Sequence, residues 1–347
     1  MSQPRFRAFA PGRVNLVGEH TDYNDGLCLP FAIERGITVT AEPLRHGRYV
    51  EARAVDLSQH DRFSLDAEID AGAPDGWRRF VRGAAAELRR EGVEPAPCRL
   101  EITGNVPAGA GLSSSAALSI ALCLALWAVV GDEPPERMGL ARLCSRIEND
   151  WCGQRTGLLD QLASLYGEEG HAVRIDMRGP HIRPVGLDLA GHRLAALDSG
   201  ARRSLAHSSY NERRNECRRV AALLGLASLR DARAGDLADL PEPLRRRARH
   251  VLSENERVDA TVAALARGDL AEVGRLLDAS HASLRDDYDV SVPEVERAVR
   301  KCRRAGAIGA RIVGGGFGGS VLALFPPGCE PPEGAVAVAP APGARLL

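Results

Sequence analysis

One turn of this chain reads Pro107-Ala108-Gly109-Ala110-Gly111-Leu112-Ser113-Ser114-Ser115-Ala116-Ala117. It follows a strand predicted at residues 98–103 and leads directly into an apolar segment, residues 116–130, that has the length of a helix. Small residues let a backbone approach an anion, and the N–H groups at the start of a helix then face that anion. This phosphate turn therefore predicts a phosphate-binding strand–turn–helix unit. A plain glycine-rich turn between strand and helix is the alternative.

Arg, Glu, His and Asp lie close together in a polar stretch, Pro11-Gly12-Arg13-Val14-Asn15-Leu16-Val17-Gly18-Glu19-His20-Thr21-Asp22-Tyr23-Asn24. Arg13 stands in a strand-like context, where it forms either a structural ion pair or a fixed cation beside phosphate charge. Glu19, His20 and Asp22 suit sugar hydroxyls, and a polar turn before a hairpin is the alternative. We discount His20 as a metal ligand because no second His or Cys stands at ligand spacing.

A third segment is almost entirely glycine: Gly314-Gly315-Gly316-Phe317-Gly318-Gly319-Ser320. Glycine adds little stability to a folded chain, because it loses more conformational freedom than any other residue. A functional reason for this glycine loop is therefore favoured over a simple hairpin turn. We expect it to form a second wall of the phosphate site.

Two carboxylates are candidates for chemistry. Asp160 lies among leucines, in Leu158-Leu159-Asp160-Gln161-Leu162, and an acid in such a place needs a partner. Glu148 lies in a predicted helix. A helix cap or a salt bridge explains such acids as well as a functional site does. Mg²⁺ prefers hard oxygen ligands and keeps several waters, so one carboxylate, one hydroxyl and phosphate oxygens are enough to hold it.

Lysine usage excludes two large classes of ATP enzyme. Lys301 is the only lysine, and it lies in a charged helical segment, Arg300-Lys301-Cys302-Arg303-Arg304. A P-loop requires Gly-Lys-Ser/Thr, and a protein kinase requires a strand lysine on the phosphates. Any ATP site in this chain must therefore work without lysine.

Composition bounds the fold and the partners. The 347 residues suit one large domain or two ordinary ones, and the 44% hydrophobic residues suffice for a core. The formal net charge of −1 gives no general attraction to nucleic acid or to an anionic membrane. The longest apolar run, residues 116–130, is too short to span a bilayer. We expect a cytoplasmic protein with reduced thiols and with neither nucleic acid nor a membrane as a partner.

Periodicity and turn signals predict an α+β protein of two lobes, joined near residues 177–190. Predicted strands cover residues 6–16, 27–29, 37–42, 49–55, 98–103, 171–176, 194–197, 310–313, 321–325 and 336–339. Predicted helices cover residues 77–91, 114–130, 132–150, 158–166, 209–224, 248–265 and 292–304. Residues 231–243 are predicted to be a polar loop.

The chain resembles the GHMP kinases (galactokinase, homoserine kinase, mevalonate kinase and phosphomevalonate kinase) and, within them, the galactokinases. The polar stretch is similar to the galactokinase signature almost residue for residue, while the phosphate turn and the glycine loop resemble motifs of the wider superfamily. Segments 210–214 and 280–288 are also galactokinase-like. The resemblance runs from about residue 5 to residue 345. Mevalonate kinases place a lysine where Arg13 stands, which separates them from this chain.

The resemblance implies a reaction: ATP phosphorylates α-D-galactose at its anomeric C1 hydroxyl, with Mg²⁺. Asp160 is then the base for that hydroxyl, and Arg13 keeps Asp160 ionised and stabilises the transferred phosphoryl group. Ser115 and Glu148 hold Mg²⁺. The implied ATP site comprises Gly109, Ala110, Gly111, Leu112, Ser113, Ser114 and Ser115, with Trp77 and Phe80 near adenine. The implied sugar site comprises Glu19, His20, Thr21, Asp22, Gly157 and Tyr210.

The resemblance also implies a two-lobed GHMP kinase fold with the active site between the lobes. Residues 1–180 would form a ribosomal-protein-like α+β domain, and residues 181–347 a ferredoxin-like α+β domain. We expect a monomer.

Departures from the galactokinase pattern leave two alternatives. Thr156 stands where galactokinases usually have Cys, Phe80 replaces a frequent Tyr, and Gly200-Ala201 replaces commoner polar residues. A changed pocket near Thr156 and Tyr210 would favour a related sugar, such as N-acetylgalactosamine or L-arabinose. The other alternative is a galactose and ATP sensor without catalysis, which the presence of all four expected catalytic and metal-binding residues argues against.

Overall fold

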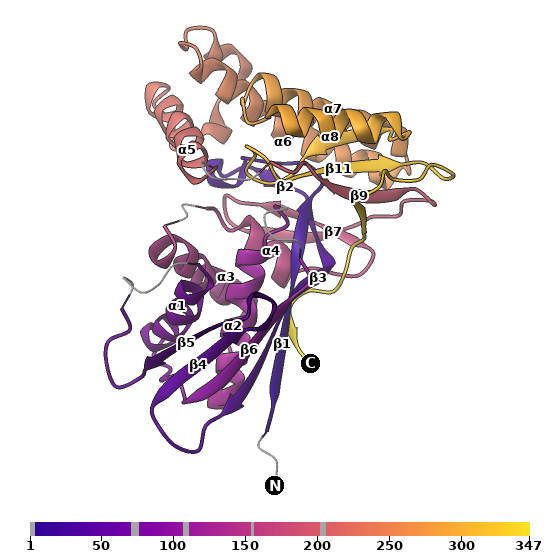
Figure 1. Cartoon of the computed structure of the whole chain (residues 1–347). Helices are drawn as coiled ribbons and strands as arrows, with labels where there is room; N and C mark the ends of the chain where they lie inside the picture. Colours follow the sequence, from indigo (N-terminus) through magenta and orange to yellow (C-terminus); the bar gives the residue numbers. More distant parts are fainter. Residues whose placement is uncertain (1–3, 71–75, 107–110, 154–155, 202–205) are drawn as a thin grey trace.

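Two lobes are stacked in the computed structural model of this chain (Figure 1). The structure describes residues 4–70, 76–106, 111–153, 156–201 and 206–347. No helix in these ranges is long and apolar enough to cross a membrane.

The first lobe is built on a six-stranded sheet with the order β13-β1-β3-β6-β4-β5. Its strands are β1 (Phe6–Asn15), β3 (Pro30–Pro43), β4 (Tyr49–Ala54), β5 (Gln59–Ser64), β6 (Cys98–Gly104) and β13 (Arg345–Leu346). Its helical segments are α1 (Trp77–Arg90), α2 (Ser114–Val130), α3 (Arg137–Arg146), the π-helical turn η3 (Ile147–Trp151) and α4 (Leu159–Leu165), with the short 3₁₀ turns η1 (Asp22–Asn24) and η2 (Val55–Leu57). Every pairing in this sheet is antiparallel except that of β4 with β6.

A four-stranded sheet with the order β10-β11-β9-β12 forms the second lobe, and α7 and α8 pack against it. Its strands are β9 (Arg193–Asp198), β10 (Gly309–Ile312), β11 (Ser320–Phe325) and β12 (Ala335–Val338). Its helices are α5 (Ala206–Leu223), α6 (Leu244–Ala266), α7 (Leu270–Asp286) and α8 (Pro293–Arg304), with the 3₁₀ turns η4 (Leu229–Asp231) and η5 (Ala234–Leu237). A third, small sheet, β2 (Leu27–Cys28), β7 (His171–Asp176) and β8 (His181–Gly186), lies between the lobes (Figure 1).

Helix α2 is the centre of the first lobe. Residues 116–127 are buried without interruption, because the helix packs against β1 and β3 on one side and against α1, α3 and α4 elsewhere. A helix that is apolar all round belongs in such a core. It ends at Gly131, whose φ of 88° is the left-handed conformation typical of a helix C-terminus.

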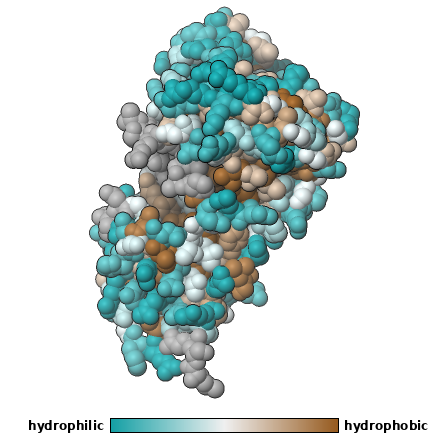
Figure 2. Space-filling view, turned by 45° about the vertical axis from the view of Figure 1, so that its right-hand side comes forward, coloured by the Kyte–Doolittle hydropathy of each residue, from teal (hydrophilic) through white to brown (hydrophobic). Residues whose placement is uncertain are grey.

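The lobes share a hydrophobic core. Val14 and Leu16 at the end of β1 are fully buried in one cluster with Val258 of α6, Leu277 of α7 and Leu322 of β11. On the face drawn in Figure 2, hydrophilic residues cover most of both lobes, and hydrophobic residues show mainly near the waist between them. The part of the polar stretch that follows Leu16 is therefore carried from one lobe into the other.

Most predicted elements are confirmed. The strand at residues 171–176 and the helix at residues 114–130 have their predicted bounds. The prediction missed α7, β5, β8 and β13, and the predicted loop 231–243 contains η5. The helix predicted for residues 132–150 starts later, at Arg137, and its last turn, η3, is π-helical.

The predicted division at residue 180 does not coincide with a break between sheets. It falls inside the β7–β8 hairpin, where Asp176 pairs with His181. The chain also returns to the first lobe near its end, because β13 pairs with β1.

We expect Leu122→Ala to lower the free energy of unfolding by about 2–5 kcal/mol, because it leaves a cavity in a packed core. Leu122 is fully buried in the middle of α2. Urea denaturation followed by circular dichroism measures the change. Leu57→Ala is the matched control, since Leu57 is 57% exposed and its truncation should change stability by about 0.5 kcal/mol or less. Equal losses in the two variants would contradict a core centred on α2.

Candidate active site

An ion pair joins Arg13 of β1 to Asp160 of α4. Arg13 Nε donates to Asp160 Oδ1 at 2.8 Å, and Arg13 Nη2 lies 2.7 Å from the same oxygen. The Ser113 hydroxyl donates to the other carboxylate oxygen. The pairing of β1 with β3 shifts register between Pro11 and Arg13, and such a bulge re-aims a side chain. The two residues with predicted catalytic roles, the cation Arg13 and the acid Asp160, are therefore in direct contact.

The phosphate turn is anchored on the strand that carries Arg13. Arg13 Nη1 donates to the Gly111 carbonyl at 2.6 Å, and the Arg13 backbone N–H donates to the Leu112 carbonyl at 3.1 Å. Gly12 permits this approach, because a Cβ there would lie 2.5 Å from the Leu112 oxygen. The predicted cradle residues Gly109 and Ala110 lie outside the described residues.

The start of α2 faces the same ion pair. Ser113 precedes the helix with a φ of 62°, and its hydroxyl binds Asp160 instead of capping a helical N–H. Ser114 and Ser115 follow in the first turn, where backbone N–H groups have no helical acceptor. The first turn of α2 thus offers N–H donors to an anion close to Asp160.

Glu148 of η3 is a buried acid with one open oxygen. It is 1% exposed, and Thr156 Oγ1 donates to its Oε2 at 3.1 Å. Its Oε1 has no hydrogen-bond partner within the described residues. Burial, and then the negative charge of Asp160, raise the pKa of Glu148 to about 7, while the hydrogen bond from Thr156 opposes the rise. A cation beside Oε1 would satisfy this oxygen.

Asp22 and Gly157 are in contact, as their shared assignment to the sugar site predicted. A Cβ at Gly157 would lie 2.1 Å from Asp22 Oδ2, so only glycine fits there. Burial, and then Asp160, raise the pKa of Asp22 to about 7. Asp22 therefore belongs to the same acidic cluster as Asp160.

His20 and Tyr210 also come together, although they are far apart in the sequence. Their ring centroids are 5.3 Å apart, and His20 Nδ1 lies 2.7 Å from the Tyr23 hydroxyl. Burial lowers the pKa of His20 well below its usual value, so its imidazole is neutral. Tyr210 packs against the glycine loop, where a Cβ at Gly315 would lie 2.9 Å from its ring.

Glu19 and Thr21 are held more tightly than the sequence suggested. The Gly314 N–H donates to Glu19 Oε1 at 2.7 Å, and Arg311 Nη2 lies 3.4 Å from the same oxygen. The fully buried Thr21 hydroxyl contacts the carbonyls of Gly18 and Leu27 at 2.9 and 2.7 Å. Thr21 thus stabilises the turn. The predicted contact with sugar is not supported, because its hydroxyl is buried and already bonded to the backbone.

The glycine loop contacts residues that were assigned to the sugar site. Its described contacts include Glu19 through Gly314 and Tyr210 through Gly315. Its predicted place as a second wall of the phosphate site stays a prediction.

The two aromatic residues predicted near adenine lie on the first turn of α1. The Trp77 indole N–H donates to Gln59 Oε1 at 2.9 Å, and the ring is half-buried. Phe80 is 8% exposed and belongs to the core of the first lobe. Trp77 is therefore the more accessible of the two to a base.

Sequence reasoning missed residues that support the site from elsewhere. Ser113 was expected only in the phosphate cradle, and Thr156 was noted only as a departure. Arg311 and two α6 residues, His250 and Glu254, contact Glu19 and were not singled out. No local motif marks these three residues, because their partners in the polar stretch lie more than 200 positions away.

Three family models match the chain. The galactokinase galactose-binding signature matches residues 1–43, the GHMP kinases N terminal domain matches residues 79–168, and the GHMP kinases C terminal domain matches residues 261–340. The first match covers the polar stretch, the second covers the phosphate turn, Glu148 and Asp160, and the third covers the glycine loop.

Curated relatives named galactokinase align with nearly the whole chain. The Roseiflexus sp. protein is 43% identical over 330 aligned positions, and the alignment covers 91% of this chain and 82% of the relative. The Mycobacterium tuberculosis protein is 44% identical over 323 aligned positions, and the alignment covers 91% of this chain and 88% of the relative.

Solved structures agree with these matches. Lactococcus lactis galactokinase, solved in complex with galactose, has a TM-score of 0.89 and 31% identity, and the match covers 99% of this chain and 95% of that one. Methanococcus jannaschii mevalonate kinase shares the fold, with a TM-score of 0.72 at 17% identity over 98% of this chain and 99% of that one. The predicted two-lobed α+β fold is confirmed, and the chain belongs to the galactokinase family of the GHMP kinases.

Proposed function

We propose that this chain transfers the γ-phosphoryl group of ATP to the anomeric C1 hydroxyl of α-D-galactose, giving α-D-galactose 1-phosphate and ADP. The observation that carries the proposal is the position of Asp160. This acid binds Arg13 of β1 and Ser113, which precedes α2. Its negative charge also raises the pKa of Asp22, which is assigned to the sugar site. An acid between a phosphate cradle and a polyol site is what sugar phosphorylation requires.

Asp160 accepts the proton of the attacking hydroxyl in this proposal. Arg13 and Ser113 fix the orientation of its carboxylate, since each binds a different oxygen. Arg13 also contacts the phosphate turn through Gly111, so it is placed to neutralise charge on the moving phosphoryl group. Phosphoryl transfer depends on such positioning and charge neutralisation more than on covalent chemistry.

Ser115 and Glu148 are proposed to hold Mg²⁺ together with the phosphate oxygens of ATP. The open Oε1 of Glu148 suits a cation, and a bound cation would favour the ionised carboxylate, whose pKa burial and Asp160 otherwise raise. The described residues contain no group of three or more His, Cys, Asp and Glu side chains that could hold a metal. A shared site of this kind fits Mg²⁺, which retains waters and binds substrate phosphates. The bound ion would neutralise charge between the phosphates.

Galactose is proposed to bind beside Asp22, Gly157, His20 and Tyr210. The absence of a side chain at Gly157 lets the Asp22 carboxylate lie against its backbone. A neutral imidazole and a tyrosine ring add polar and apolar contacts to this side of the site. Glu19, which accepts the N–H of Gly314 in the glycine loop, is also proposed to contact galactose.

The proposal is tested by ADP release with ATP, Mg²⁺ and a panel of galactose, 2-deoxygalactose, N-acetylgalactosamine, glucose and L-arabinose. We expect galactose to have the highest kcat/KM, and phosphorus NMR of the product to show phosphate on C1. A higher kcat/KM for another sugar would change the substrate and keep the reaction. Galactose binding without turnover would support a sensor instead.

We expect Arg13→Ala and Asp160→Asn each to lower kcat severely while the fold is kept. A phosphoryl-transfer arginine contributes about 10³–10⁵ in rate, and a general base about 10²–10⁴. Steady-state kinetics measures the loss, and circular dichroism checks the fold. Arg7→Ala on the same strand and Asp239→Asn on the surface are matched controls, since both residues are exposed. Near-normal turnover in either test variant would remove that residue from the mechanism.

Glu148→Gln should raise the Mg²⁺ concentration needed for half-maximal activity by about tenfold or more, because an amide oxygen binds a hard cation less strongly than a carboxylate does. Binding of Mn²⁺ with ADP, measured by electron paramagnetic resonance, gives a readout independent of turnover. The exposed Glu133 provides the control variant Glu133→Gln. Unchanged metal affinity in Glu148→Gln would exclude Glu148 as a ligand.

A further inference from the structure

The backbone of the polar stretch is bound by a helix of the other lobe. The N–H groups of Gly18 and Glu19 both donate to Glu254 Oε1, at 2.9 and 3.4 Å. The Glu19 carbonyl lies 3.1 Å from His250 Nε2. Glu254 and His250 are one turn apart on α6. Both backbone polar groups of Glu19 therefore contact α6.

Glu254 is an anion buried within this contact. It is fully buried, and its Oε1 also accepts the Ser280 hydroxyl of α7 at 2.7 Å. Its Oε2 accepts Arg257 Nε at 2.6 Å. Burial alone would raise the pKa of Glu254, but Arg257, His250 and Arg311 together hold it below its usual value. A buried carboxylate of this kind holds the N–H and O–H groups around it in place, because leaving a buried donor or the charge itself unpaired costs free energy.

The segment that Glu254 binds needs an anchor. Gly18 has a φ of 93° and His20 a φ of 61°, so left-handed backbone stands on both sides of Glu19. The turn is also tight, because a Cβ at Gly18 would lie 2.6 Å from the Leu27 carbonyl. Conformations of this kind persist where surrounding contacts determine them.

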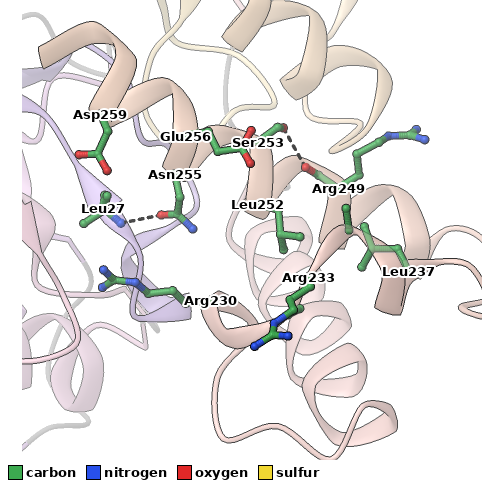
Figure 3. A pocket seen from close by; sticks show the side chains of 12 residues that line it. Leu27, Arg230, Arg233, Leu237, Arg249, Leu252, Ser253, Asn255, Glu256 and Asp259 are labelled. Carbon is green, nitrogen blue, oxygen red and sulfur yellow. Dashed lines mark hydrogen bonds between the residues drawn. The ribbon is translucent and has the colours of Figure 1, made fainter. Parts of the chain in front are cut away.

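The far end of the same loop is bound by the same helix. Asn255 Oδ1 accepts the Leu27 N–H at 2.7 Å, at the edge of a cavity lined by α6 and by η4 and η5 (Figure 3). Adjacent residues of α6, Glu254 and Asn255, thus bind the two ends of the segment 18–27. Glu256, the next residue, is exposed and also lines this cavity.

We propose that Glu254 is a positioning residue for the sugar, acting through the backbone of Gly18 and Glu19 to hold Glu19 and His20 at the sugar site. The identity of the sugar rests on the proposed function. The phosphate turn is held separately, by β1 through Arg13 and by Asp160 through Ser113. Loss of Glu254 should therefore weaken sugar binding and spare nucleotide binding.

The test is Glu254→Gln, which keeps the shape of the side chain and removes the charge on which its donors converge. We expect KM and Kd for galactose to rise about tenfold or more, as for the loss of hydrogen bonds to a buried charge. The KM for ATP should stay within about twofold of the wild-type value. Glu256→Gln is the control, because it makes the same change on the exposed side of the same helix.

Amide hydrogen exchange of the segment 18–24, followed by mass spectrometry, measures directly how firmly Glu254 holds this backbone, and it needs no substrate. We expect faster exchange of this segment in Glu254→Gln and wild-type exchange in Glu256→Gln. If Glu254→Gln does not fold, Ser280→Ala replaces it, because it removes one donor to Glu254 and should raise exchange and the sugar Kd in the same direction. Unchanged exchange together with an unchanged sugar Kd would overturn the proposal, as would equal losses for sugar and ATP.

These outcomes differ from failure of the proposed function. If the wild-type protein prefers another sugar, galactose is the wrong substrate, and the same comparison with the preferred sugar still tests Glu254. If the wild-type protein binds no sugar, the exchange measurement alone decides whether Glu254 holds the segment 18–24.

Discussion

The ion pair between Arg13 and Asp160 joins residues 147 positions apart, and most of the site is arranged around it. Arg13 comes from a bulged strand, and Asp160 comes from the first turn of α4. The same arginine binds the Gly111 carbonyl, and the same carboxylate accepts the Ser113 hydroxyl. One contact thus sets the distance between β1, α4 and the start of α2. A shift of any of these elements would move the base, the cation and the phosphate turn together.

Negative charge is concentrated around this pair. Asp160 contributes to the raised pKa values of both the half-buried Asp22 and the buried Glu148. Carboxylates gathered in this way repel one another and lose hydration, so the unliganded site is electrostatically unfavourable. A divalent cation would reduce the repulsion between the carboxylates, and hydroxyl donors would replace the hydrogen bonds lost with hydration. The ligands of a sugar kinase are therefore the groups that this cluster lacks.

The local part of this arrangement could be predicted from sequence, and the long-range part could not. The bounds of α2 follow from its apolar run and from Gly131, and the candidate residues lie in motifs with their own composition. The helix α7 was missed because small and polar residues interrupt it, and Gly274 is needed inside it, where a Cβ would lie 2.6 Å from the Ile308 carbonyl. The anchor at Glu254 depends on tertiary packing, because nothing near it in the sequence resembles a binding site.

The sheet of the first lobe takes its edge strand β13 from residues that follow the whole second lobe. The end of β1, in turn, is buried in a cluster with α6, α7 and β11. Each lobe therefore includes chain from the other half of the sequence, as an edge strand in the first lobe and as buried core residues in the second. Two fragments divided near residue 180 would each lack chain that their sheet or core uses, so a gene cut at that point would not encode two complete lobes.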